Sequence, residues 1–383
     1  MSQPSAIIVG AGIVGLAVAR ALAIKGYKIK VIERGHAATG ASIRNFGMIW
    51  PIGQPAGELY ETAILSKRIW KEVCDSAGIW YDEPGSIHLA YHSDEAEVLE
   101  ELASVYQDRG YQFLNKEDTI KKSAHAVREQ LLGSLYSDQE MIVDPREAII
   151  KLPAWLAEKY DVEFIFGKAV TDIAYPAVYC GTEEWEADEI YVCSGSDLET
   201  LYPRIFSTLP VIKCKLQMMR MAAQPVNERI GPAFCGGLSL LHYSSFKAAA
   251  SLSRLKKRME TELPLYIKSG IHVMVSQNHA GELTIGDSHE YSHSPDPFDK
   301  QSINRLILDY LKTFARFNDE TITETWNGVY CKLTNGQPWL IAEPEKGVKV
   351  INGLGGAGMT LSFGLCEQLI NKKLRSQQNL YAV

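Results

Sequence analysis

Three glycines near the start of the chain, Gly10, Gly12 and Gly15, stand in the order G-x-G-x-x-G within "IIVGAGIVGLAVA". In this spacing the first glycine permits a sharp turn, the second lets the backbone approach a pyrophosphate, and the third lets a helix pack closely on a strand. Ile13 and Val14 open that helix, whose free N–H groups and dipole favour a doubly anionic group. The pattern predicts a dinucleotide site, although alone it also fits an ordinary strand-to-helix turn.

An acid in the right place strengthens the dinucleotide prediction. Glu33 ends the next apolar run, "YKIKVIERG", where a carboxylate can accept hydrogen bonds from ribose hydroxyls and disfavours a 2′-phosphate. The supporting elements are a buried strand over 6–9, a helix over 13–25 that Gly26 ends, and a second strand before Glu33. A secretory signal is not expected, because no Lys or Arg precedes the apolar run.

A second group of glycines lies near the other end of the chain, in "VKVINGLGGAGMTLSFGL". A strand over 348–351 runs into Gly353, Gly355, Gly356 and Gly358, and a helical pattern follows. The N-terminus of such a helix can stabilise the negative charge that develops around N1 and the C2 carbonyl of a reduced flavin. The alternative is a glycine cluster that serves packing only.

The composition limits the class of partner. The formal net charge is −7, so the chain has no overall positive field to attract nucleic acid. The seven cysteines contain no CxxC pair, which argues against a disulfide framework and a zinc site and fits a reducing cytoplasm. No run reaches the roughly 20 apolar residues that cross a bilayer. We therefore expect a cytoplasmic protein with a small-molecule partner, no metal, no nucleic acid and no integral membrane association.

The order of "VGAGIVG", "VIERG", "VDP", "YVCSGSD" and "GGAGMTLSFG" resembles the D-amino-acid oxidase family of FAD-dependent oxidoreductases, which includes glycine and sarcosine oxidases. The resemblance covers nearly the whole chain. It implies FAD as cofactor and oxidation of a C–N bond in a small amine or amino acid, giving an imine that water hydrolyses. "TGASIRNFGMIWPIGQ", "KLQMMR" and "GDSHEY" resemble a subgroup associated with phosphonate catabolism, which implies an aminophosphonate-type substrate.

The implied fold is α/β, α+β overall, with two domains. A discontinuous Rossmann-type FAD-binding domain is expected from 1–80, 144–205 and 323–383, and a substrate domain with a large mixed or antiparallel sheet from 81–143 and 206–322. Asp144 is a predicted N-cap, since Pro145 follows it at a first helical position. Strands are predicted over 211–221 and in "IHVMVSQ" and "ELTIGD", with a helix over 299–317 covering the sheet.

The motifs and the resemblance together predict which residues bind the cofactor. They are Gly10, Gly12, Ile13, Val14, Gly15, Glu33, Arg34, Ser42, Asn45, Phe46, Gly47, Met48, Val170, Cys193, Ser194, Gly195, Gly355, Gly356, Gly358, Met359 and Thr360. Val170 is expected in a strand that reaches the adenine.

Flavin amine oxidation needs anchors for the substrate more than a triad. Arg44 suits an anionic head, because a guanidinium pairs in a bidentate manner with phosphonate or carboxylate; its alternative role is to tie loop carbonyls or cofactor phosphates. His289 could bind the anion or assist amine deprotonation, and Tyr291 shares its face. Gln217 and Lys332 complete the predicted substrate site, and Gln217 could equally make simple sheet-edge contacts.

Two positions bear on the cofactor and the electron acceptor. The sarcosine-oxidase branch has an oxygen-activating lysine in a strand resembling "LTIG", where this chain has Thr284. The acceptor is therefore oxygen or another molecule, such as a quinone. Cys331 resembles the cysteine through which that branch attaches flavin, but an inert buried thiol is commoner, so FAD is expected to be non-covalent with a covalent link possible. His242, His272 and His279 show no metal spacing and are expected to be structural or solvated.

Other functions fit parts of the pattern. A hydroxy-acid dehydrogenase could pass a hydride from an alcohol carbon to the same flavin. An FAD-dependent tRNA-modifying protein is a different class, which the acidic balance disfavours. A flavin-binding module without catalysis would hold FAD and never be reduced by a small substrate.

Overall fold

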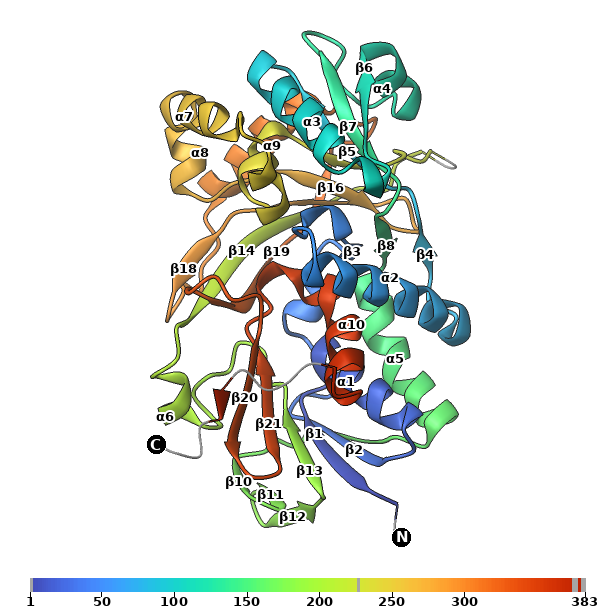
Figure 1. Ribbon diagram of the computed structural model, residues 1–383, viewed down its shortest axis with the longest axis vertical. Coiled ribbons are helices and arrows are strands. Elements are labelled where there is room, and N and C mark those ends of the chain that lie inside the picture. The colour runs from blue at the N-terminus through green and yellow to red at the C-terminus, as the bar shows by residue number, and fades with distance from the viewer. Residues whose placement is uncertain (1–2, 226–227, 374–377, 380–383) are drawn as a thin grey trace.

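A computed structural model describes residues 3–225, 228–373 and 378–379 (Figure 1). The chain forms two large sheets with helices around them. One sheet, which we call the parallel sheet, lies in the half of the molecule that contains residues 5–9, and the other, the large sheet, lies in the opposite half (Figure 1). Among the described residues, no helix combines the length and the apolar character needed to cross a membrane.

The parallel sheet has seven strands. In spatial order they are β22 (Gln378–Asn379), β20 (Leu340–Glu345), β21 (Val348–Asn352), β13 (Glu189–Val192), β1 (Ser5–Val9), β2 (Lys28–Glu33) and β9 (Glu163–Phe166). β1 pairs in parallel with β13 and β2, and β21 pairs in parallel with β13. The sheet thus joins the first strands of the chain to strands near its end, as the discontinuous fold requires.

Both faces of the parallel sheet are covered, which explains the continuous apolar character of its strands. Ala6 and Ile8 of β1 pack in a core with the helices, whereas Ile7 and Val9 pack toward a small sheet, as the two-residue period of a strand dictates. The helices are α1 (Ile13–Ile24), α2 (Glu58–Ala77), α5 (Pro145–Tyr160) and α10 (Gly358–Ile370). The small sheet consists of β10 (Asp172–Ala174), β11 (Ala177–Cys180) and β12 (Glu183–Glu186).

The large sheet has nine strands. In spatial order they are β18 (Glu290–Ser292), β14 (Val211–Met221), β17 (Leu283–Gly286), β16 (Met274–Gln277), β15 (Ala233–Cys235), β5 (Ser86–Ala90), β7 (Gly133–Ser137) and β6 (Gln112–Asn115), with β19 (Ile322–Leu333) paired antiparallel along β14. A fourth, short sheet of β3 (Met48–Ile49), β8 (Met141–Val143) and β4 (Tyr81–Asp82) lies between the two halves (Figure 1).

Several helices gather on the large sheet, on the side away from the parallel sheet (Figure 1). They are α3 (Ser93–Val105), α7 (Leu252–Glu262), α8 (Pro264–Lys268) and α9 (Gln301–Phe314); the remaining helices are α4 (Lys116–Lys122) and α6 (Pro203–Phe206). The apolar side of α9, with Ile307, Leu311 and Phe314, enters the same core as the sheet residues Met219 and Ile285. The predicted covering role of this helix is confirmed.

Most predicted elements are confirmed, among them the N-cap Asp144, which caps α5 by accepting a hydrogen bond of 2.9 Å from the N–H of Arg146. Three details differ. The chain does not return to the parallel sheet at residue 323, because β19 first pairs with β14 along its whole length. Helix α9 is shorter than 299–317. Val170 lies in a segment between β9 and β10 rather than in a strand.

Candidate active site

A cavity of about 890 Å³ is bordered both by the glycine turns beside the parallel sheet and by residues of the large sheet. This volume is within the range of small-molecule and cofactor sites. The N-terminal turns of α1 and α10 both line it, through Gly12 and Ile13 on one side and Gly358 and Met359 on the other. Two helix N-termini therefore offer positive dipole ends to one space.

The first glycine turn has no room for side chains. Gly10 has a φ of +103°, and a Cβ atom there would lie 2.5 Å from the carbonyl oxygen of Cys193. A Cβ atom on Gly15 would lie 1.9 Å from the carbonyl oxygen of Gly10, so only glycine lets α1 pack this closely on the strand end. Gly15 supports the turn from behind and does not itself line the cavity.

Glu33 lines the cavity at the end of β2. Its Oε2 accepts a hydrogen bond of 2.9 Å from the N–H of Ala11, and its Oε1 accepts one of 3.0 Å from the N–H of Gly35. These bonds join the acid to the glycine turn and leave further lone pairs for a ligand. Arg34 also lines the cavity, and its guanidinium forms an ion pair of 2.8 Å with Asp197.

The segment 41–48 passes along the cavity and is held by its own side chains. Ser42 Oγ accepts a hydrogen bond of 2.9 Å from the N–H of Ile13. The amide of Asn45 donates to the carbonyls of Ala41 and Ser42 and accepts from the N–H of Gly47. Gly47 lies outside the cavity lining, where a Cβ atom would be 1.9 Å from the carbonyl oxygen of Val143. Asn45 and Gly47 thus shape the loop that presents its neighbours.

The late glycine turn meets the early one. A Cβ atom on Gly358 would lie 3.9 Å from Ile13 Cγ2, and α1 and α10 lie side by side near the middle of Figure 1. Asn352 donates a hydrogen bond of 2.9 Å to the carbonyl of Gly195, which joins this turn to the one after β13. The glycine turns, the two helix N-termini and the acid together fit FAD in chemistry, because they offer N–H groups and positive dipole ends to a pyrophosphate and a carboxylate to a ribose.

The structure brings nearly all predicted cofactor residues to this one cavity. With the exception of Gly15 and Gly47, they all line it: Gly10, Gly12, Ile13, Val14, Glu33, Arg34, Ser42, Asn45, Phe46, Met48, Val170, Cys193, Ser194, Gly195, Gly355, Gly356, Gly358, Met359 and Thr360. Their contacts with the cofactor itself stay a prediction.

The predicted substrate residues divide into two groups. Arg44, His289 and Lys332 line the cavity, and Arg44 Nη1 donates a hydrogen bond of 3.0 Å to the carbonyl of Asn327. Gln217 does not line it, because its amide donates to Asn304 Oδ1 at 2.7 Å and to the carbonyl of Lys300, on the side of α9. Tyr291 also lies outside the lining and is 45% exposed.

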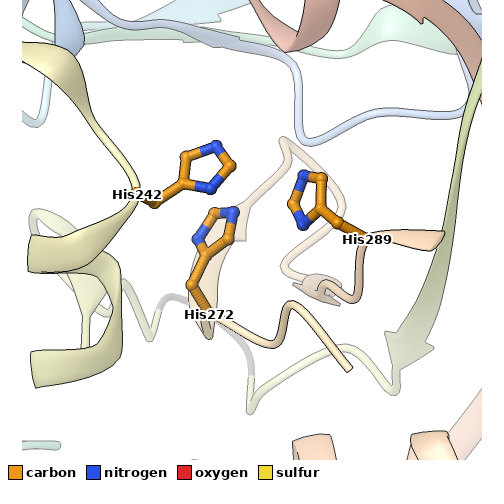
Figure 2. A group of neighbouring side chains, drawn as sticks. All are labelled: His242, His272 and His289. Atoms are coloured by element: carbon orange, nitrogen blue, oxygen red, sulfur yellow. The ribbon is translucent and has the colours of Figure 1, made fainter. Parts of the chain in front are cut away.

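Sequence reasoning missed a cluster of histidines at the cavity wall. His242, His272 and His289 each offer a ring nitrogen, and these nitrogens lie within 4.8 Å of one another. Figure 2 shows the three rings turned toward a common space from three separate segments. All three line the cavity, which the sequence predicted for His289 alone, since His242 and His272 were expected to be structural or solvated. Below, these residues are called the histidine cluster.

Asp287 supports the histidine cluster from the protein side. Its Oδ1 lies 3.0 Å from His272 Nε2 and 3.9 Å from His289 Nδ1, and the backbones of His272 and Asp287 exchange two hydrogen bonds. The 3.0 Å contact is poorly aligned for a hydrogen bond, so it is an ion-pair distance rather than a formed bond. His289 Nδ1 lies 2.9 Å from the carbonyl of Gly270, which fixes this nitrogen as the donor.

Burial sets the charge states around the cluster. Burial alone would raise the pKa of Asp287, but His272 and His289 outweigh it and lower this pKa below its usual value. Burial lowers the pKa of His289, and Asp287 opposes the shift. His242 borders the cavity with its exposed surface. The surrounding protein nevertheless desolvates its ring, which lowers its pKa well below the usual value, and His272, His289 and Lys332 lower this pKa further. Asp287 is therefore ionised while His242 and His289 are neutral at pH 7.

Cys331 lines the cavity but is only 3% exposed. Burial raises the pKa of its thiol to about 12, so the nucleophilic thiolate is scarce at neutral pH. This environment is that of an inert thiol.

Known proteins resemble this chain over most of its length. It is 23% identical over 348 residues to one of the subunits of opine oxidase from Rhizobium meliloti, covering 86% of this chain and 83% of that protein. It is 22% identical over 374 residues to glycine oxidase of Geobacillus kaustophilus, covering 93% of this chain and 89% of that protein.

The fold also has a close counterpart among solved structures. The crystal structure of glycine oxidase from Bacillus cereus superposes with a TM-score of 0.77 at 18% identity, covering 98% of this chain and 96% of that one. The family model described as "FAD dependent oxidoreductase" matches residues 5–371. The chain therefore belongs to the DAO family of FAD-dependent oxidoreductases.

Proposed function

We propose that this protein oxidises the C–N bond of a small anionic amine, which is an amino acid, an N-methyl amino acid or an aminophosphonate. The observation that carries the proposal is one cavity that the glycine turns line together with His289 and Lys332. Lys332 lies beside the late glycine turn, where it forms an isolated β-bridge with Leu354, so a substrate held by these side chains would lie close to the cofactor.

Bound FAD supplies the acceptor for a hydride from the carbon beside the amine, and the resulting imine is hydrolysed by water. The protein's part is to bind and orient. The N-terminal turn of α10, from Gly358 to Thr360, has no acidic residue and presents a positive dipole end to the cavity. That end favours the negative charge that hydride transfer leaves in the site.

We assign the anionic end of the substrate to two basic side chains, Lys332 on the large sheet and Arg44 in the segment 41–48. Lys332 lies on β19, lines the cavity and is close enough to lower the pKa of His242 and of His289. Arg44 is half-buried and uses one of its five donors on the carbonyl of Asn327, which leaves others for the substrate. These two cations make an anionic substrate more favourable than a neutral one.

Similar proteins support an amine rather than a hydroxy acid. Glycine oxidase, the opine oxidase protein and a D-amino acid dehydrogenase of Helicobacter pylori are named for amino-acid or opine chemistry, and they match this chain at 22–24% identity. The motifs "TGASIRNFGMIWPIGQ", "KLQMMR" and "GDSHEY" favour an aminophosphonate among these amines. Thr284, where the sarcosine-oxidase branch has a lysine, favours an electron acceptor other than oxygen.

An anaerobic screen tests the proposal. FAD-loaded protein is mixed with N-methyl amino acids, D-amino acids, aminophosphonates and hydroxy acids, and the oxidised-flavin absorbance is followed. We expect an amine with a carboxylate or phosphonate group to bleach the flavin and to yield the aldehyde or keto product. Bleaching by hydroxy acids alone would contradict the proposal. Reoxidation of the bleached enzyme by oxygen and by a soluble quinone, compared at equal concentration, then identifies the acceptor.

A further inference from the structure

The histidine cluster contains buried polar atoms that the fold itself leaves without partners. His272 is 3% exposed, and neither of its ring nitrogens has an aligned hydrogen-bond partner among the described residues. The neighbouring oxygen Asp287 Oδ1 is likewise buried and without a partner in that part of the chain. A buried polar atom without a partner costs free energy, so a group of them at a cavity wall indicates that a further ligand binds there.

The surroundings of the rings leave them lone pairs rather than hydrogen atoms to offer. His289 Nδ1 donates a hydrogen bond of 2.9 Å to the carbonyl of Gly270, so in the neutral imidazole the lone pair lies on Nε2. His272 Nε2 lies 3.0 Å from Asp287 Oδ1, and a small turn about its broad χ2 torsion would align a hydrogen bond there and leave the lone pair on Nδ1. Histidines that ligate metal ions have their second nitrogen held in this way, by a backbone carbonyl or a carboxylate.

We propose that His242, His272 and His289 form a binding site for one divalent transition-metal ion of the Zn²⁺ type. The three rings come from separate segments and turn toward a common space at the cavity wall (Figure 2). Imidazole nitrogens suit zinc, iron, nickel and copper ions, whereas Mg²⁺ and Ca²⁺ prefer oxygen ligands. The proposal departs from the expectation of no metal, which was based on spacing in the sequence alone.

The number of ligands indicates what such a site can do. Structural zinc sites are closed by four protein ligands, whereas three protein ligands leave a coordination position open. All three histidines line the cavity, so an open position here would face the space that receives small molecules. An ion at this wall can therefore bind an oxygen or nitrogen atom of a cavity ligand.

Binding of the ion requires one ring to move slightly. Two nitrogens at about 2.0–2.1 Å from one zinc ion are at most about 4.2 Å apart, whereas the nitrogens of the cluster lie within 4.8 Å of one another. The rings of His242 and His272 are stacked with their centroids 3.8 Å apart, so His242 must turn to direct a nitrogen to the same point. His242 is exposed and its χ2 torsion is broad, so this turn costs little.

The charges near the cluster set the expected strength of binding. The carboxylate of Asp287 lies 3.0 Å from His272 Nε2 and 3.9 Å from His289 Nδ1, where its negative charge offsets part of the charge of the ion. Lys332 also lines the cavity and repels the ion. We therefore expect weaker binding than in a closed structural zinc site. All seven cysteines are buried, so no exposed thiol competes for the ion.

The test uses FAD-loaded protein without an affinity tag. The protein is dialysed against a chelator and then titrated by calorimetry with Zn²⁺ and, separately, with Mg²⁺. Elemental analysis after gel filtration measures the ion that each sample retains. We expect one equivalent of Zn²⁺ per chain and no binding of Mg²⁺ at the same concentration. Absence of stoichiometric Zn²⁺ binding, or equal binding of the two ions, would overturn the inference.

Variants assign the bound ion to the cluster. His242→Ala removes an exposed ligand without leaving a buried gap, and it should retain flavin and weaken Zn²⁺ binding at least about tenfold. Asp287→Asn keeps the shape of the buried side chain but removes its charge, and it should weaken Zn²⁺ binding by about 10- to 100-fold. His279→Ala is the matched control, since that histidine is exposed and lies outside the cavity lining, and it should bind Zn²⁺ like wild type. Undiminished binding in His242→Ala would place the ion elsewhere and overturn the inference.

The metal site and the proposed function can fail separately. Flavin reduction by an amine, in protein that binds no stoichiometric Zn²⁺, would overturn the metal site and leave the proposed function intact. Zn²⁺ binding that His242→Ala loses, in protein whose flavin no amine reduces, would do the reverse.

Discussion

Glu33 Oε2 accepts a hydrogen bond of 2.9 Å from the N–H of Ala11, so the acid at the end of β2 is fastened to the glycine turn after β1. The same carboxylate lines the cavity. Glu33 therefore holds the shape of the turn, and we expect it also to accept hydrogen bonds from the ribose of the cofactor.

Replacing Glu33 by Ala removes charge-assisted hydrogen bonds from both partners. We expect the affinity for FAD to fall by about 1–3 kcal/mol, which is roughly a 5- to 150-fold rise in Kd. Fluorescence titration of deflavinated protein with FAD measures the change. Glu186→Ala, at an exposed position on β12, is the control and should bind FAD as wild type does. Unchanged affinity in Glu33→Ala would contradict the assigned role.

The variant Gly15→Ala tests how closely α1 approaches the end of β1. In Gly15→Ala the new methyl group would lie 1.9 Å from the carbonyl oxygen of Gly10, so the helix must move and the turn must open. We expect a loss of about 1–3 kcal/mol in the free energy of unfolding, measured in urea, together with a lower flavin content. Gly40→Ala is the control for the free energy of unfolding alone, because its φ is −78° and a Cβ atom there has no protein neighbour within 4 Å, whereas its place in the cavity lining rules it out as a control for flavin content. Equal stability of the two variants would show that the packing is looser than described.

The burial of the Cys331 thiol predicts how FAD is attached. Because burial raises the pKa of this thiol to about 12, we expect FAD to be bound without a covalent link. Acid precipitation should leave the yellow colour in the supernatant, and Cys331→Ser should retain as much flavin as wild type. A yellow pellet that turns colourless in Cys331→Ser would establish the covalent bond instead.

The burial of His88 predicts how the free energy of unfolding depends on pH. The side chain is 1% exposed, neither ring nitrogen has a hydrogen-bond partner among the described residues, and burial lowers its pKa to about 3. Between this value and the unfolded-state pKa of about 6.5, the unfolded chain binds a proton that the folded chain does not. The free energy of unfolding should therefore fall as the pH is lowered through this window, by up to about 1.4 kcal/mol per pH unit.

Urea unfolding at pH 5 and pH 7, with saturating FAD, measures the effect. His88→Phe should lose less stability between these pH values than wild type, since Phe246 already packs against this ring with centroids 5.1 Å apart. His293→Gln, at an exposed position, should keep the wild-type slope. Identical slopes in wild type and His88→Phe would show that another group controls acid sensitivity.

The cofactor half of the site was predictable because its signals are local. The turn at Gly10 and the acid at Glu33 are fixed by a strand, a helix and a second strand that follow one another directly in the sequence. The convergence of this turn with the one at Gly358 is not local, so the glycines of the second cluster could only indicate a flavin contact, and the likeness to a family added the expectation that both turns hold one cofactor. The range of β14 was also predictable, since eleven residues of strong β character follow a proline.

The substrate half was harder to predict, because its geometry depends on strand pairing between distant segments. His272 and Asp287 meet through their paired backbones at the ends of β16 and β17, and His242 arrives from a separate turn. No spacing in the sequence encodes that meeting. Strand alternation explains why Gln217 lies outside the cavity. Leu216 and Met218 on either side of it line the cavity, so the residue between them points to the other face of the sheet.

The side-by-side placement of α1 and α10 has a consequence for biosynthesis. The ribosome makes the strands of the large sheet after α1 and before α10, so the first glycine turn waits for its counterpart until α10 has emerged. We therefore expect tight cofactor binding only after α10 has been synthesised. A yellow colour in freshly synthesised protein thus reports that translation has passed α10 and that both halves have assembled.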